Sequence, residues 1–260
     1  MSKHEPYYSA KAFIGFDVHK RSIFACALIQ ETGELREKSF SGNGYEEVSS
    51  WIKSFADSAS AVYEAGPFGF SLARFLNSQG IRCVVTHSNT LWASNPRRNK
   101  TDKEDARELA RILSVGYVKP IYIPTEGEEA RRSLCKERMH QVQAKGDIQR
   151  RILSFLDRHG MGESVDFSKW CEPYVDWLDS ISFVSQEDTV LLSSLLSMRE
   201  EIIRSLKGID SQIEVIVSTN EDMQLLGRVY GIGNVTAFTI AAEAINLHRF
   251  KSSKAYASYF

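Results

Sequence analysis

The sequence has no apolar run of membrane length, and its first residues, Met1 to Glu5, do not resemble a signal peptide. We therefore expect a cytoplasmic protein with no membrane partner. Its four cysteines lack the paired spacing of a zinc site, which favours reduced, buried thiols over disulfides or metal ligands. The formal net charge is only −1, so any contact with nucleic acid must come from local basic patches.

The first half of the chain alternates strand and helix patterns. With 260 residues, 43% of them hydrophobic, the chain is long enough for a buried core and more than one domain. The predicted elements are strands at Ala12 to Asp17, Arg21 to Ile29, Leu35 to Phe40, Ser60 to Glu64 and Ile81 to Thr86, with helices at Tyr45 to Phe55, through Leu72 and Leu76, and near Leu91. In such α/β sheets, sites form outside the carboxyl ends of the strands, so Asp17 and Glu64 can converge there.

Two more acids open the next helix, which runs from Thr101 to about Val115. Asp102 and Asp105 are three residues apart and therefore neighbours on one helical face. An ordinary explanation is available, because Thr101 and Glu104 form a capping-box pattern and acids in a first turn suit the helix dipole. Together with Asp17 and Glu64, however, these acids stand where a two-metal nuclease of the ribonuclease H type needs ligands for Mg²⁺.

Three segments carry a family resemblance: Gly15 to Lys20, Tyr63 to Gly66, and Lys100 to Ala106. They resemble the DEDD transposases of bacterial insertion sequences, a family that also includes Piv-type DNA invertases and RNA-guided bridge recombinases. The resemblance implies an α/β, ribonuclease H-like (RuvC-like) domain with a mixed sheet. It also implies that the catalytic, metal-binding acids are Asp17, Glu64, Asp102 and Asp105, with Mg²⁺ or Mn²⁺ as cofactor, DNA as substrate and a guide RNA as partner.

Basic residues near these acids are candidates for contacts with nucleic-acid phosphates. The candidates are Arg97, Arg98, Lys100, Lys103 and Arg107 around the acidic site, and Arg131, Arg132 and Arg138 on a predicted helix from Glu128 to Arg158. A charge run on a helix is often only a solvated face, and this alternative stays open for the second group.

A later segment has the pattern of a long helix with a buried apolar seam. Apolar residues recur three and four apart from Leu192 to Ile216, with a single charged interruption at Arg199. We expect a helical hairpin that also forms a homo-oligomer, a dimer or a tetramer, because Arg199 suits a purely intramolecular core poorly. The alternative is an ordinary antiparallel hairpin within a monomer.

The C-terminal segment contains Gly231-Ile232-Gly233 before an apolar helix, which resembles a helix-hairpin-helix loop. Glycines at Gly231 and Gly233 would let backbone N–H groups approach a DNA phosphate, although a plain turn is a fair competitor. We expect three domains: a RuvC-like catalytic domain (1–125), a helical coiled-coil region (126–220) and the start of a small helical transposase domain (221–260). The resemblance further implies a nucleophilic serine in a stretch that no position here matches, as in a truncated chain.

Other functions remain possible on the same residues. A stand-alone Mg²⁺-dependent, structure-specific nuclease resembling a junction resolvase would use the same acids with water as nucleophile. A non-catalytic nucleic-acid-binding subunit would need only the basic helices and the seam. A sugar-kinase-like ATPase shares the opening pattern, but Asp17 to Lys20 lacks the glycine-bearing phosphate turn that such an enzyme requires.

Overall fold

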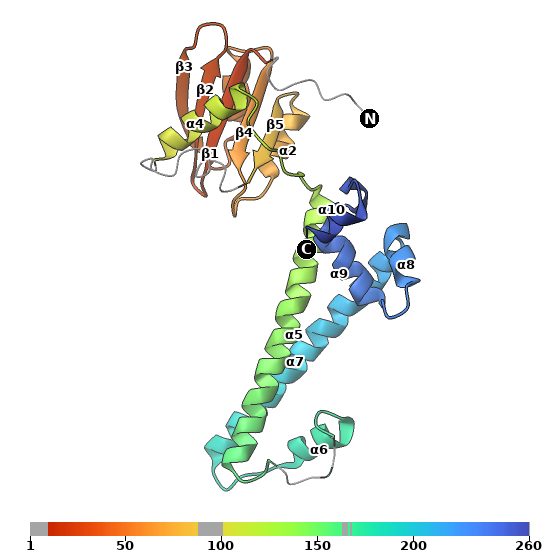
Figure 1. The fold of residues 1–260 in the computed structure, drawn as a ribbon. Coiled ribbons are helices and arrows are strands. Elements are labelled where there is room, and N and C mark those ends of the chain that lie inside the picture. Colours follow the sequence, from red (N-terminus) through yellow and green to blue (C-terminus); the bar gives the residue numbers. More distant parts are fainter. Residues whose placement is uncertain (1–9, 88–100, 163–165, 167, 260) are drawn as a thin grey trace. The chain divides into compact units, whose positions relative to one another are not determined.

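The computed structural model describes residues 10–87, 101–162, 166 and 168–259 (Figure 1). The chain forms two compact units that meet in sequence between Pro124 and Thr125. Each unit is described by itself. The helix expected near Leu91 lies outside the described residues.

The first unit is built on a mixed five-stranded sheet with the order β3-β2-β1-β4-β5. The described elements are β1 (Ala12–Val18), β2 (Ser22–Ile29), β3 (Leu35–Ser41), α1 (Tyr45–Lys53), β4 (Ala59–Glu64), α2 (Ser71–Ser78), β5 (Arg82–Thr86) and α4 (Asp102–Ser114). β1 pairs antiparallel with β2, and β2 with β3, whereas β1 is parallel to β4 and β4 to β5. The expected ribonuclease H-like fold class is therefore confirmed.

Helices cover both faces of this sheet. Because side chains alternate along a strand, β1 contributes to two apolar layers. Ile14 and Phe16 are buried with residues of α1 and α2, whereas Phe13 is buried with Leu109 and Leu113 of α4. Figure 1 shows α4 crossing one face of the sheet. The buried apolar area on both faces is what stabilises the unit.

Gly15 lets α4 approach β1 closely. A Cβ atom at this position would meet the Ala106 carbonyl oxygen and lie 2.6 Å from the Ala110 backbone nitrogen. Both obstacles are backbone atoms of α4, so neither can move aside as a flexible side chain would. The glycine therefore fixes the distance between the strand and the helix that carries Asp102 and Asp105.

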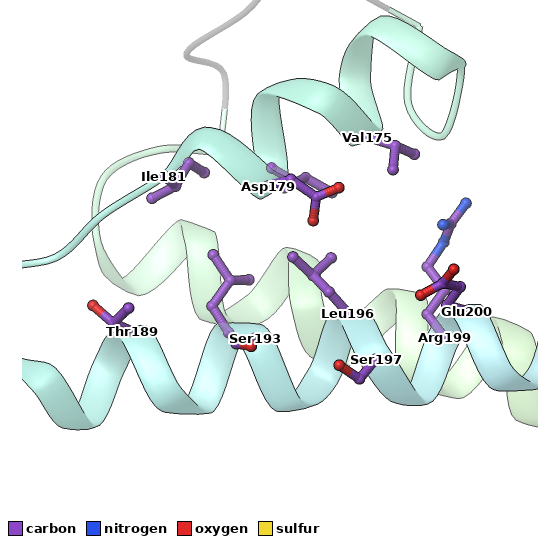
Figure 2. A pocket seen from close by; sticks show the side chains of 11 residues that line it. Val175, Asp179, Ile181, Thr189, Ser193, Leu196, Ser197, Arg199 and Glu200 are labelled. Carbon is purple, nitrogen blue, oxygen red and sulfur yellow. The ribbon is translucent and has the colours of Figure 1, made fainter.

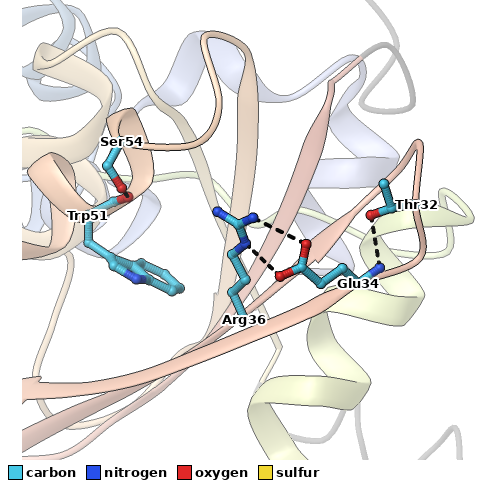
Figure 3. A network of polar contacts seen from close by, with 5 residues as sticks. All are labelled: Thr32, Glu34, Arg36, Trp51 and Ser54. Atoms are coloured by element: carbon cyan, nitrogen blue, oxygen red, sulfur yellow. Dashed lines mark hydrogen bonds and ion pairs between the residues drawn. The ribbon is translucent and has the colours of Figure 1, made fainter.

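Local polar contacts shape the hairpin between β2 and β3 (Figure 3). Gly33 has φ +69°, which suits glycine in the turn, and the Thr32 hydroxyl accepts a hydrogen bond of 3.2 Å from the Glu34 backbone N–H. Arg36 donates two hydrogen bonds, of 3.0 and 3.1 Å, to the Glu34 carboxylate. These groups are exposed, so the pair contributes little stability beyond holding the turn.

The second unit is helical in all of its described elements. They are α5 (Glu126–Arg158), α6 (Glu172–Ser180), α7 (Gln186–Ser218), α8 (Glu221–Gly227), α9 (Asn234–Ala244), the 3₁₀ helix η2 (Leu247–Arg249) and α10 (Ser253–Ala257). The two long helices, α5 and α7, pair as an antiparallel hairpin, which agrees with the expected hairpin (Figure 1).

The hairpin has an apolar core at each end. At one end, Ile152 and Phe155 of α5 pack with α6 and with Leu195 of α7. At the other end, Cys135 and Ile213 pack with α8 and α9. Between the two cores, Arg138 of α5 and Asp210 of α7 form an ion pair of 2.6 Å. All four cysteines are free; three are buried, as expected, whereas Cys171 is only half-buried.

Arg199, the charged residue that interrupts the apolar seam of α7, contacts residues of the same chain. Its guanidinium lies over the Trp170 ring, 4.9 Å from the ring centre, and burial lowers the pKa of this group, with Asp179 acting in the opposite direction. Arg199, Asp179 and Glu200 also line a cavity of about 460 Å³ between α6 and α7 (Figure 2). Its Nε atom is buried and has no hydrogen-bond partner among the described residues, in keeping with the expectation that Arg199 suits an intramolecular core poorly. Oligomerisation itself stays a prediction.

Candidate functional site

Two of the predicted acids, Asp17 and Glu64, lie at the carboxyl ends of neighbouring parallel strands. Phe16 of β1 pairs with Tyr63 of β4, so the two acids follow at matching register positions. Val62 packs toward α4, and residues two apart on a strand share a face, so Glu64 lies on the α4 side of the sheet. Since paired strands are about 4.8 Å apart, Asp17 and Glu64 start from adjacent backbone positions on the same face.

Helix α4 brings Asp102 to the end of β1. Nε2 of His19, just beyond β1, lies 2.9 Å from Oδ2 of Asp17 and 3.6 Å from Oδ1 of Asp102. One possible ligand atom from each of these three residues lies within 4.8 Å of the other two. Two of the predicted acids, far apart in the sequence, therefore come together in one cluster.

The other two predicted acids lie nearby in the fold but outside this cluster. Asp105 is 7% exposed and follows Asp102 by three residues in the first turn of α4. Glu64 is the last residue of β4 and is half-buried. The cluster of three described residues includes neither of them. The assignment of all four acids as metal ligands thus stays a prediction.

The charged form of Asp17 is disfavoured by its surroundings. Burial raises the pKa of this carboxyl, and the nearby Asp102 carboxylate adds to the increase, whereas hydrogen bonding and charge from His19 act in the opposite direction. Only 20% of the Asp17 side chain is exposed. A cation between the two carboxylates would offset both unfavourable effects, which is the electrostatic behaviour expected of a metal site.

The sequence did not single out His19, although it lies within the first resemblance segment. Its backbone N–H donates a hydrogen bond of 2.9 Å to the Ser22 carbonyl, and its ring meets the Phe68 ring edge to face, with centres 6.5 Å apart. Its spacing from Asp17 could have indicated this contact. Side chains two residues apart along an extended chain lie on the same side, so His19 can lie beside the Asp17 carboxylate.

Two ion pairs link α4 to strand β3 of the sheet. Glu37 of β3 forms ion pairs with Lys103, at 2.8 Å, and with Arg107. Burial alone would raise the pKa of Glu37, but hydrogen bonds and charge from these two cations outweigh it and lower the pKa. Lys103 and Arg107, which we expected to contact phosphates, therefore already have a partner within the unit, and their role toward nucleic acid stays a prediction.

The other basic candidates differ in their surroundings. Arg97, Arg98 and Lys100 lie outside the described residues. Arg132 pairs with Glu243 at 3.1 Å, and Arg138 with Asp210 as described above. Arg131 is half-buried and lines a shallow pocket beside α8 and η2. Two of the three basic candidates on α5 thus form ion pairs within the second unit.

The two glycines of the expected helix-hairpin-helix-like loop lie in the short connection between α8 and α9. Gly231 has φ +87°, and Gly233 is the residue immediately before α9. Between the helices, Tyr230 is fully exposed and Val229 is 55% exposed. The shape suits a phosphate contact at the start of α9, which stays a prediction. Among the described helices, none combines the length and the apolar character needed to cross a membrane.

Comparison with known proteins connects both units to transposases. A family model for DEDD transposases of the IS110 type matches residues 14–161, and a second, described as the transposase IS116/IS110/IS902 family, matches residues 223–260. The putative transposase y4qE of Sinorhizobium fredii (strain NBRC 101917 / NGR234) is 27% identical over 253 residues, covering 96% of this chain. The transposase for insertion sequence element IS1533 of Leptospira borgpetersenii is 26% identical over 243 residues, covering 90% of this chain.

The chain is shorter than these relatives. The matched part spans 62% of the Sinorhizobium protein and 69% of the Leptospira protein. The first family model nevertheless accounts for more than half of the chain and includes Asp17, Glu64, Asp102 and Asp105, while the second covers α9 and the residues after it. The chain therefore belongs to the IS110 family of DEDD transposases.

Proposed function

We propose that this chain acts in DNA transposition, with Asp17, Glu64, Asp102 and Asp105 holding divalent metal ions in its ribonuclease H-like unit. The observation that carries the proposal is the meeting of Asp17 and Asp102 beside His19, in a chain of the transposase family. The relatives from Sinorhizobium and Leptospira are both named as transposases, which supports the same reaction class.

The donor set suits a divalent cation. Carboxylate oxygens are the ligands that Mg²⁺ and Mn²⁺ prefer, and Asp17 and Asp102 present two of them within 4.8 Å. When bound, a pair of such ions would polarise a scissile phosphodiester and stabilise the attacking and leaving oxygens of an in-line displacement.

The fold would hold the proposed carboxylate ligands in fixed positions around the metal site. Asp17 is fixed by the pairing of β1 with β2, and Glu64 by the pairing of β4 with β5. Asp102 is fixed by the start of α4, where the Thr101 hydroxyl accepts a hydrogen bond from the Glu104 backbone N–H. Acids held on strands and a capped helix keep their geometry better than acids on loops, which favours a preorganised site.

The partners would be DNA and a guide RNA. Resemblance to RNA-guided recombinases supports the RNA, whose base pairing would choose the target while protein cations contact the backbone. Arg131 and the glycines Gly231 and Gly233 of the second unit are available for such contacts. A dimer or a tetramer formed through the helical hairpin would bring two DNA ends together.

The test is excision of a marked insertion element in cells that express the protein, with RNA recovered from the purified protein. Asp17→Asn and Asp102→Asn should lower excision by about a hundredfold or more, because each removes a proposed metal ligand. Glu104→Gln is the matched control, since it removes an exposed acid from the same turn as Asp102. Circular dichroism should show that all three variants fold.

Other results would assign another function. If the purified protein cut branched DNA with Mg²⁺ but carried no RNA, a junction-resolvase-like nuclease would replace the guided recombinase. If Asp17→Asn left the cellular activity unchanged, the chain would be a non-catalytic nucleic-acid-binding subunit, and the proposed metal centre would be rejected.

A further inference from the structure

We propose that His19 is itself a metal ligand, and that its ring nitrogen shifts the preference of the acid cluster from Mg²⁺ toward transition metals such as Mn²⁺. The inference rests on the proposed function, because it concerns the same site. It adds a nitrogen donor to a set of four acids that would otherwise offer oxygen alone.

The distances around His19 are those of ligands that share one ion. When two ligand atoms each lie about 2.1 Å from a metal, they are about 3 Å apart if adjacent and about 4.2 Å apart if opposite. Nε2 of His19 is 2.9 Å from Asp17 Oδ2 and 3.6 Å from Asp102 Oδ1. Both separations fall within this span, and the ligand atoms of Asp17 and Asp102 lie within 4.8 Å of each other. Side-chain rotations that close the remaining gap would let one ion reach all three atoms.

The backbone holds the imidazole in this place. His19 lies in the short connection between β1 and β2, where its N–H donates to the Ser22 carbonyl at 2.9 Å and the register of the two strands closes at Val18 and Ile23. Phe68 contacts the ring at its edge. About half of the His19 side chain, 49%, is exposed, so an ion arriving from solvent can reach the nitrogen.

The nitrogen changes which ion is bound best. Mg²⁺ is a hard cation that prefers an octahedron of oxygen ligands and retains several waters. Imidazole nitrogen favours first-row transition metals, whose affinity for mixed nitrogen and oxygen sites exceeds that of Mg²⁺. A site made of Asp17, Asp102 and His19 should therefore bind Mn²⁺ at least about tenfold more tightly than Mg²⁺.

The experiment uses Mn²⁺ as the probe, because it is paramagnetic. Pulsed electron paramagnetic resonance of the Mn²⁺-loaded chain should show a directly coordinated nitrogen, and labelling with ¹⁵N-histidine should change its coupling. His19→Asn replaces the imidazole by a shorter amide, whose oxygen does not reach the position of Nε2. It should remove the nitrogen signal, weaken Mn²⁺ binding about tenfold or more and leave Mg²⁺ binding nearly unchanged. His140→Asn, at an exposed position of α5, is the matched control and should change nothing.

The outcomes separate this inference from the proposed function. If Mn²⁺ binds and Asp17→Asn abolishes binding, but no nitrogen coupling is seen, His19 only donates a hydrogen bond to Asp17; the inference then fails and the metal centre stands. A nitrogen signal that persists in His19→Asn also overturns the inference. If the wild-type protein binds neither Mn²⁺ nor Mg²⁺, both the inference and the proposed centre are rejected.

Discussion

Helices α4 and α5 begin with the same kind of sequence. Each follows a threonine, Thr101 or Thr125, whose hydroxyl accepts a hydrogen bond of 3.2 Å from the backbone N–H of a glutamate three residues later. Each has three acids in its first turn. By sequence alone, both starts fit ordinary helix capping, in which acids interact favourably with the positive end of the helix dipole.

The two helix starts use their acids differently. At α5, the Glu128 carboxylate accepts hydrogen bonds from the Thr125 N–H, at 2.8 Å, and from the Thr125 hydroxyl, at 3.0 Å, which closes a capping box. At α4, Asp102 lies 3.6 Å from His19, beside Asp17. An acid in the first turn of a helix can therefore either cap that helix or contribute to a site on a neighbouring strand. Which of the two it does depends on what packs against the first turn.

The largest expected effect comes from the glycine that sets this packing. Gly15→Ala should lower the free energy of unfolding of the first unit by about 3 kcal/mol or more, because the new methyl group meets backbone atoms of α4 that cannot move independently. The matched change at the other helix, Gly127→Ala, adds a methyl group in open space. It should be neutral or stabilise by about 0.5 kcal/mol. Urea unfolding followed by circular dichroism measures both.

The same pair of variants tests the link between packing and the site. Gly15→Ala should also weaken Mn²⁺ binding, because Asp102 moves with α4, whereas Gly127→Ala should not. A Gly15→Ala protein with unchanged stability and unchanged Mn²⁺ affinity would show that the close approach of α4 to β1 does not set the acid cluster.

An intermediate effect is expected from the two threonine caps. Thr101→Ala and Thr125→Ala should each cost about 1 kcal/mol of stability, because each leaves a helix-start N–H group without its side-chain acceptor. Only Thr101→Ala should also reduce the thermal stabilisation that Mg²⁺ or Mn²⁺ provides, since its cap positions Asp102. Thermal unfolding with and without metal distinguishes the cases. Equal losses of metal stabilisation in both variants would remove the functional difference between α4 and α5.

Much of the fold could be predicted because it follows from short-range patterns. The apolar run of β1, the Glu31 to Glu34 turn and the apolar stripe of α4 through Leu109 and Leu113 all agree with the structure. The helical hairpin also followed from the spacing of apolar residues in α7. The order of strands in the sheet did not follow, because it depends on pairing between segments distant in the sequence.

The details of the site were harder to predict because they depend on contacts across the fold. Nothing in its own turn shows that His19 will meet Asp102, since their contact requires α4 to lie on β1. Similarly, the environment of Arg199 could not be predicted from the seam, because Trp170 comes from a separate segment and supplies an aromatic face for the guanidinium. The four acids were named from family resemblance, whereas their geometry required coordinates.

The smallest expected effect concerns the proton on Asp17. Its pKa is raised first by burial and then by the neighbouring charge of Asp102. Because the folded-state pKa lies above the unfolded value, ionised Asp17 lowers stability at any pH above the folded pKa, and this penalty disappears as the pH falls below the unfolded value. Asp102→Asn removes one of the two causes. It should therefore lower the pKa of Asp17 toward, but not to, the ordinary value of 3.8, since burial remains.

A ¹³C NMR titration of the Asp17 carboxyl in metal-free protein measures this shift. The matched variant Glu126→Gln, which removes an acid from the first turn of α5, should leave the titration unchanged. If Asp102→Asn also left it unchanged, the two carboxylates would not affect each other in solution. The similarity between the two helix starts would then extend to their roles, and the acids of α4, like those of α5, would serve only to begin a helix.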